Sequence, residues 1–108
     1  MNPAVLTAFA LVIVADGQGS AYPGIPGHEP SIVDGRKAAE RIHQCVDQLR
    51  AIVPNGGSYV SESNYFESGF QQVYWGSNYP RLVEIKNKYD PNGLFFVHNG
   101  IGSENWER

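Results

Sequence analysis

Few side chains in this 108-residue sequence have the types and spacing that catalysis or metal binding requires. Its three histidines, His28, His43 and His98, form no pair at metal-ligand spacing. Its single cysteine, Cys45, excludes an internal disulfide and a zinc site built from cysteines. The sequence therefore predicts no metal site. Cys45 falls in the middle of an expected helix and is interpreted as a small buried apolar residue.

Glu62 is the carboxylate best suited to chemistry. It ends a short β-prone stretch that begins at Tyr59, and aromatic residues stand close to it in the sequence. Aromatic surroundings can turn a carboxylate into a general base. From composition alone, an exposed or hydrogen-bonded Glu62 with a structural role is the better interpretation, and the catalytic one stays open.

The overall composition limits the classes of partner. The formal net charge is −3, with 42% hydrophobic and 18% charged residues, which fits a folded globular chain of one domain at most. The sequence contains no cluster of Lys and Arg. This argues against a nucleic acid or an anionic membrane as the partner.

The first apolar segment, residues 4–15, has Thr7 as its single polar residue. We expect a buried helix, with Asn2 as its N-cap and Pro3 in its first turn. The alternative is the apolar part of a secretory signal, although no positive side chain precedes it. Twelve residues are too few to span a bilayer. A helix that is apolar on all sides needs a partner that covers it.

A long helix is expected over residues 35–52. The Gly- and Pro-rich residues 16–30 precede it and predict an ordered loop or linker. Ser31 and Asp34 have the spacing of a capping box, and Asp34 could also be the cap itself. The apolar stripe that indicates the helix consists of Ala39, Ile42, Val46 and Leu49.

A second helix is expected after the aromatic, irregular residues 66–76. Ser77 or Asn78 caps it, Pro80 lies in its first turn, and the turn that begins at Asp90 ends it. The side chains expected to face inward are Leu82, Ile85 and Tyr89.

Two short segments have strand character. Residues 58–61 are β-prone and could continue to Tyr65, and residues 94–98 are an apolar run. Together with the helices they predict an α+β fold, with helices packed on part of an antiparallel sheet.

Several motifs carry a resemblance to a known family. YWGSNYPRL at 74–82, IK at 85–86 and KYDPNGLF at 88–95 resemble the C-terminal signature of berberine bridge enzyme-like flavin oxidases. That family belongs to the wider group with a vanillyl-alcohol-oxidase-type FAD-binding domain. The tail at 97–106 resembles the fungal branch. Residues 1–5 and 21–30 are also similar to internal stretches of the fungal proteins.

The resemblance implies site residues in two segments. In plant members a Tyr-x-Asn-Tyr motif ends in the tyrosine that serves as catalytic base. Tyr59-Val60-Ser61-Glu62 stands at this place, so Glu62 is implied as a base or substrate-orienting carboxylate and Tyr59 as a residue that shapes the pocket. Ser61 and Asn99 occupy positions that lie close to the flavin in the family.

The resemblance further implies an incomplete substrate-binding domain of a two-domain oxidase. Residues 1–30 would be a helix and loop of that domain, and residues 31–108 its berberine-like C-terminal region. The parent would oxidise a small organic substrate (a sugar, an alcohol or an alkaloid-like molecule) with FAD as cofactor and oxygen as acceptor. The FAD-binding domain has no counterpart in these residues, so we expect a fragment or truncated gene product that is inactive and binds no FAD tightly. Members of the family are often secreted, but no convincing signal peptide is present, and the localisation stays open.

A non-catalytic interaction module is the alternative. In that case the aromatic side chains of Phe66, Phe70 and Tyr74 would form an exposed patch for a partner. That partner could be a separately encoded flavin-binding half.

Overall fold

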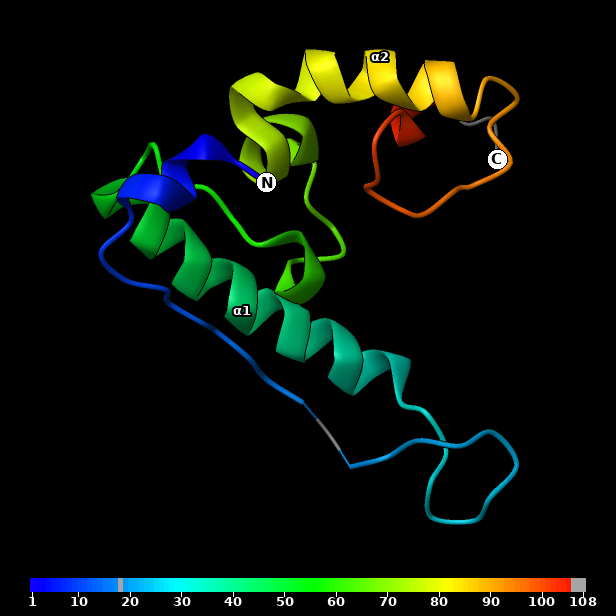
Figure 1. The fold of residues 1–108 in the computed structure, drawn as a ribbon. Coiled ribbons are helices and arrows are strands. Elements are labelled where there is room, and N and C mark those ends of the chain that lie inside the picture. The colour runs from blue at the N-terminus through cyan, green and yellow to red at the C-terminus, as the bar shows by residue number, and fades with distance from the viewer. Residues whose placement is uncertain (18, 106–108) are drawn as a thin grey trace. The chain divides into compact units, whose positions relative to one another are not determined.

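The computed structural model describes residues 1–17 and 19–105, and it is helical, with no β-strand among these residues (Figure 1). The expectation of an α+β fold with an antiparallel sheet is therefore wrong. A strand needs a neighbour that pairs with its backbone, and no second strand is present among the described residues. Residues 58–61 instead lead into a single 3₁₀ turn, Val60–Glu62, and residues 94–98 form no regular element.

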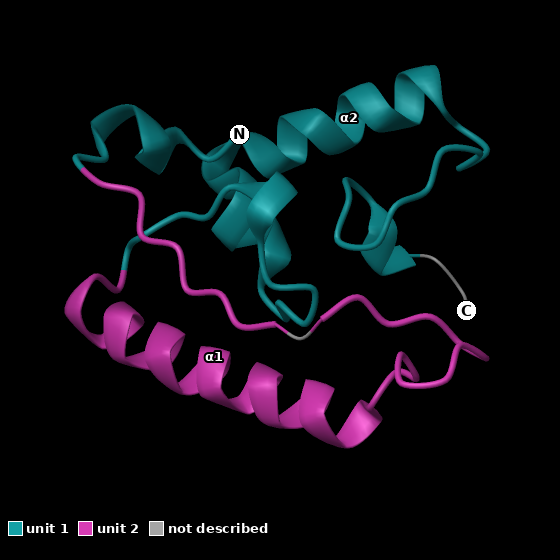
Figure 2. Cartoon of the chain, turned by 90° about the horizontal axis from the view of Figure 1, so that it is seen from below, with its two compact units in different colours: residues 1–9, 55–108 teal, residues 10–54 magenta. Residues whose placement is uncertain are grey.

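The chain divides into two compact units, coloured in Figure 2. One unit consists of residues 10–54. The other combines residues 1–9 with residues 55–108, so the two ends of the sequence belong to the same unit. None of the described helices is long and apolar enough to cross a membrane.

Helix α1, Ile32–Ile52, is the main element of the unit 10–54 and confirms the long helix expected from 35 to 52. The capping interaction is confirmed as well: Ser31 Oγ accepts a hydrogen bond from Asp34 N at 3.2 Å and lies 2.7 Å from Asp34 Oδ2. This cap lets the helix begin one turn earlier than expected. Cys45 is exposed, so its interpretation as a buried residue is wrong. The single buried residue of α1 is Ala38, which shows how little of the helix is covered.

The Gly- and Pro-rich segment contains two consecutive tight turns, as expected for an ordered loop. Ile25 N donates to Tyr22 O at 3.3 Å, and His28 N donates to Ile25 O at 2.9 Å. Gly24 and Gly27 take positive φ values of 81° and 79°, which glycine adopts without strain. Tyr22 N also donates to His28 O at 2.7 Å and closes the loop.

The expected N-terminal helix is only partly present. Asn2 is the N-cap and accepts from Ala4 N at 3.0 Å, as expected, but the element is a 3₁₀ helix that covers Pro3–Thr7. From Ala8 the backbone is extended, and the large apolar side chains that follow are exposed: Phe9, Leu11, Val12 and Ile13. The run of β-branched residues is a poor helix former, and no described residue covers it.

The core of the unit 1–9/55–108 lies where a π-helix meets helix α2. The π-helix, Gln71–Trp75, continues through a 3₁₀ turn, Gly76–Asn78, into α2, Tyr79–Tyr89 (Figure 1). Phe70 and Tyr74 are buried, and the ring of Phe70 meets those of Tyr74 and Tyr79 at centroid distances of 6.5 and 6.2 Å.

Helix α2 begins and ends where the sequence predicts. Asn78 occupies the N-cap position, although its amide donates to Met1 O at 2.9 Å instead of capping the helix. Asp90 follows the last turn. The expected inward face is wrong for two of its three members, since Ile85 and Tyr89 are exposed while Leu82 is half-buried. A last 3₁₀ turn covers Ser103–Asn105.

The side chain of Asn2 fastens the N-terminus to the π-helix. Asn2 is buried, and its Nδ2 donates to Gln72 O and to Val73 O, both at 2.9 Å. It lies against two glycines, because a Cβ atom built on Gly57 or on Gly76 would come within 2.8 Å of the Asn2 amide. All polar groups of this side chain are therefore paired inside a space that two glycines leave open.

Candidate functional site

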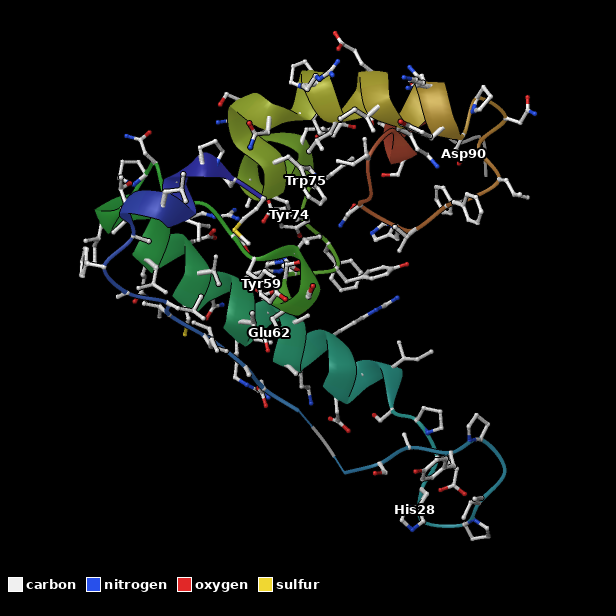
Figure 3. The ribbon with its side chains drawn as sticks, in the orientation of Figure 1. His28, Tyr59, Glu62, Tyr74, Trp75 and Asp90 are labelled. Atoms are coloured by element: carbon white, nitrogen blue, oxygen red, sulfur yellow. The ribbon has the colours of Figure 1, made fainter. Side chains whose placement is uncertain are left out.

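The residues expected to act in chemistry lie together on one short turn. Tyr59 precedes the 3₁₀ turn Val60–Glu62, and Glu62 N donates to Tyr59 O at 3.2 Å. Tyr59, Ser61 and Glu62 are all exposed. Figure 3 shows Tyr59 and Glu62 on this turn. The carboxylate of Glu62 makes no hydrogen bond or ion pair within the described part of the chain, so it is available to a ligand.

The π-helix holds this segment from both sides. Before the turn, Ser58 N donates to Val73 O at 2.9 Å. After the turn, the hydroxyl of Tyr74, whose side chain is 1% exposed, donates to Asn64 O at 2.7 Å. A buried phenol with its hydroxyl paired is a rigid anchor, because its ring is packed and its polar end is satisfied.

Asn99, expected close to the cofactor, is brought to the end of the same segment. Its Nδ2 donates to Tyr65 O at 3.0 Å, and Nε2 of His98 lies 2.7 Å from the same oxygen. The ring of His98 also stacks on that of Tyr65 at a centroid distance of 4.0 Å. The structure thus places Tyr59, Glu62 and Asn99 on connected segments of one unit.

Asp90 and Lys86 organise the apolar residues that precede His98. The Asp90 carboxylate accepts from Leu94 N at 2.8 Å and from Phe95 N at 3.0 Å, and the Lys86 ammonium donates to Asp90 and to Phe95 O. The hydrogen bond from Lys86 is the main cause that lowers the pKa of Asp90. This network leaves a row of exposed apolar side chains: Leu94, Phe95, Phe96 and Val97.

Tyr79 ties the last described turn to α2. Its hydroxyl donates to Glu104 Oε2 at 2.5 Å and accepts from Gly102 N at 3.1 Å. Burial, together with the hydrogen bond to Glu104, raises the pKa of Tyr79 to about 12. The phenol therefore stays protonated and keeps its donor at any physiological pH.

The residues present do not form a flavin site by themselves. The side chains of Ser61 and Asn99 offer edge contacts at most, and one of the two N–H donors of the Asn99 amide is engaged by Tyr65 O. The shallow hollow on the surface of α1 is lined by Arg36, Lys37, Glu40 and Arg41 and is far too open to enclose an isoalloxazine ring. No group of three or more His, Cys, Asp or Glu side chains suited to a metal ion occurs within 1–17 and 19–105.

The aromatic patch of the interaction-module hypothesis is wrong for two of its three members. Phe70 and Tyr74 are buried, and Phe66 alone is exposed. Aromatic content did not reveal which rings face solvent, because that depends on the π-helix that turns Phe70 and Tyr74 inward.

Three residues that shape the site were not assigned this role from the sequence. Tyr74 binds the carbonyl of Asn64, Asn2 binds the N-terminus to the π-helix, and His98 binds the carbonyl of Tyr65. Their partners lie 10, 70 and 33 residues away, and no local pattern signals such contacts. The one available signal was the Asn-Gly pair at 99–100, which favours a tight turn that presents its neighbours.

Comparison with known proteins gives one family and several fungal relatives. Residues 58–102 match the family "Berberine and berberine like". The chain is 48% identical over 80 residues to the FAD-linked oxidoreductase easE of Arthroderma otae, covering 72% of this chain and 13% of that protein. It is 48% identical over 60 residues to an uncharacterized FAD-linked oxidoreductase of Arthroderma benhamiae, covering 56% of this chain and 10% of the relative.

A third relative is a VAO-type flavoprotein oxidase, VAO615, of Thermothelomyces thermophilus, with 39% identity over 72 residues, 67% of this chain and 12% of the relative. The chain thus spans about a tenth of the length of the relatives it matches. No solved structure matches it significantly.

Proposed function

Because residues 58–102 place the chain in the berberine and berberine-like family of FAD-linked oxidoreductases, we propose that it supplies the C-terminal part of the substrate site of such an enzyme. The observation that carries the proposal is the turn Val60–Glu62, which holds an unpaired, exposed carboxylate next to Tyr59 inside the matched region. Glu62 acts as the base or substrate-orienting carboxylate, and Tyr59 shapes the pocket.

The cofactor in this proposal is FAD, held by the flavin-binding part of the parent enzyme, with Ser61 and Asn99 facing it. The described residues lack an enclosing site, so the chain alone binds FAD weakly and does not turn over substrate. The substrate is a small sugar, alcohol or alkaloid-like molecule, and oxygen is the final acceptor. The exposed apolar residues, such as Phe9 and Leu94–Val97, support the presence of a covering part, because a folded protein rarely leaves so many uncovered.

Complementation tests the proposal. The chain is produced together with the Arthroderma otae easE relative lacking its own matched 80 residues. We expect a stable complex that keeps its flavin absorbance after desalting and releases hydrogen peroxide with at least one member of a panel of sugars, alcohols and amines. Glu62→Gln should lower turnover by about 100-fold or more, as expected for loss of a general base.

Glu84→Gln is the matched control, because Glu84 lies on the exposed side of α2 and pairs with Arg81 at the surface. This control should leave turnover unchanged. Full activity in the Glu62→Gln variant would refute the role of Glu62. Flavin retained, or substrate turned over, by the chain on its own would refute its dependence on a second part.

A further inference from the structure

The segment that carries Glu62 is held by an unusual convergence of side chains on its backbone. Two consecutive carbonyl oxygens, those of Asn64 and Tyr65, accept hydrogen bonds from three side chains. Tyr74 binds the first oxygen, and His98 and Asn99 bind the second. A local turn does not require hydrogen bonds from side chains outside it, so these three contacts fix the segment relative to the rest of its unit.

The turn that supplies two of these donors has an uncommon backbone. Asn99 has a φ of +56°, the only positive value at a non-glycine residue among those described. The next residue, Gly100, has no room for a Cβ atom, which would lie 2.9 Å from Val97 O. Gly100 N donates to the same oxygen at 3.0 Å and closes the turn. Left-handed backbone costs free energy at a residue with a side chain, and such conformations concentrate at functional sites.

The positive φ allows neighbouring side chains to converge on one acceptor. His98 and Asn99 both reach Tyr65 O, and the imidazole also stacks on the Tyr65 ring. A carbonyl oxygen can only accept, so Nε2 of His98 carries the proton in this contact. The turn therefore binds Tyr65 through two hydrogen bonds and one ring contact. We call these contacts of His98 and Asn99 with Tyr65 the grip.

Glu62 depends on this grip because its own carboxylate has no partner in the described structure. Its backbone is fixed by Glu62 N to Tyr59 O at 3.2 Å, and Ser63 Oγ donates to Val60 O at 2.8 Å. The next fixed points along the chain are the carbonyls of Asn64 and Tyr65. If the second fixed point is released, the segment from Val60 to Tyr65 loses two side-chain hydrogen bonds and one ring contact at its far end.

We propose that His98 and Asn99 are positioning residues, which hold the Tyr65 carbonyl and thereby aim the Glu62 carboxylate at the substrate. The catalytic half of this inference rests on the function proposed above for Glu62. Asn99 thus has a role toward the protein in addition to any contact with the cofactor. For His98, positioning is the only role in this proposal.

Hydrogen exchange of the full chain tests the grip directly. His98→Phe keeps an aromatic ring on Tyr65 but removes the donor, His98→Gln keeps a donor without the imidazole, and Asn99→Asp keeps the shape of the side chain but replaces its donor by an oxygen. The amides to follow are those of Glu62 and Glu67, which donate to Tyr59 O and Asn64 O. Loss of one donor should accelerate their exchange about 5-fold, and loss of both about 30-fold.

Two controls separate positioning from general destabilisation. The first control is the Ser58 amide, which donates to Val73 O before the turn and should exchange as in the wild type in every variant. The second control is Asn92→Asp, the same type of substitution at an exposed turn, in which all amides should exchange as in the wild type. His98→Gln should restore slow exchange. Wild-type exchange in the His98→Phe/Asn99→Asp double variant, or an equal acceleration that includes Ser58, would overturn the inference.

The complemented enzyme tests the catalytic half. We expect His98→Phe, which leaves Asn99 and its contact with the cofactor intact, to lower turnover by about the factor that it shows in exchange. In the Glu62→Gln background the same substitution should cause no further loss, because positioning acts through that carboxylate. Unchanged turnover, or a loss that adds fully to that of Glu62→Gln, would overturn this half. If complementation gives no turnover with wild-type chain, the proposed function fails, whereas the exchange experiment still decides the grip.

Discussion

Gly57→Ala tests whether the Asn2 side chain fastens residues 1–9 to the π-helix. A Cβ atom at position 57 would lie 2.8 Å from Nδ2 and 2.9 Å from Cγ of Asn2. Atoms do not approach so closely, so the Asn2 side chain must move. Gly57 has no positive φ, so alanine introduces no backbone strain and the clash is its expected cost.

The magnitude follows from the hydrogen bonds that Asn2 would weaken. Its amide donates to Gln72 O and Val73 O and accepts from Ala4 N, at 2.9, 2.9 and 3.0 Å. Each such bond contributes about 1 kcal/mol to the free energy of unfolding. A displacement that breaks two of the three should cost about 2 kcal/mol, which lies inside the range of about 1–3 kcal/mol observed for overpacking.

Urea unfolding followed by circular dichroism measures this cost in a double-mutant cycle with Asn2→Ala. Once Asn2 is truncated to alanine, the nearest atom left to the added methyl group is the Cβ of residue 2 at 3.2 Å, a tight contact that a small shift relieves. Gly57→Ala should therefore cost less than about 1 kcal/mol in that background. Gly35→Ala in α1 is the matched control. It meets nothing within 4 Å and should stabilise the chain by about 0.5–1 kcal/mol. An equal cost of Gly57→Ala with and without Asn2 would refute the steric argument.

Three further predictions concern single side chains. Tyr74→Phe removes a buried donor from a carbonyl and should lower the free energy of unfolding by about 1–2 kcal/mol in urea titrations, and an unchanged midpoint would contradict the anchor role. Because the pKa of Tyr79 is raised from 10.0 to about 12, its contribution to the free energy of unfolding is complete below pH 10 and is lost as the pH rises from 10 to 12. Ultraviolet absorbance of the phenolate should therefore include a Tyr79 titration near 12 that Tyr79→Phe removes, and a Tyr79 titration near 10 would contradict its hydrogen bond to Glu104. The pKa of Asp90 is lowered from 3.8, so its contribution to the free energy of unfolding is present above pH 3.8 and is lost as the pH falls below that value. The protection of the Leu94 and Phe95 amides against hydrogen exchange should decrease over this range and in Asp90→Ala. Protection that does not change with pH would show that the carboxylate does not hold these amides.

Local patterns predicted the helices because a helix is stabilised by residues close in sequence. The stripe and cap of α1 and the Pro80 and Asp90 boundaries of α2 were all present as short-range signals, and the structure confirms them. The family was also readable from sequence, since residues 74–95 carry its motifs as three closely spaced stretches and the match covers 58–102. Nothing in the structure tests the roles assigned to Tyr59, Ser61, Glu62 and Asn99, which stay predictions.

The prediction of two strands was wrong because a strand depends on a partner that can be distant in the sequence. Residues 58–61 and 94–98 have β-prone side chains, but a strand exists through its partner, and β-propensity reports on the side chains alone. With no paired neighbour among the described residues, the first segment leads into a 3₁₀ turn, and amides of the second bind the carboxylate of Asp90. The same reasoning applies to residues 9–13, whose apolar side chains cannot form a buried helix without something to cover them.

The sequence by itself determined helices α1 and α2, the Ser31 cap of α1 and the family, because each depends on neighbours along the chain. Only the tertiary structure decided that Phe70 and Tyr74 face inward, that Asn2 lies between two glycines, and that the Tyr65 carbonyl is held from a turn more than thirty residues away. Those contacts depend on where the backbone carries each group in space, and a hydrogen bond between distant residues leaves no periodicity in the sequence.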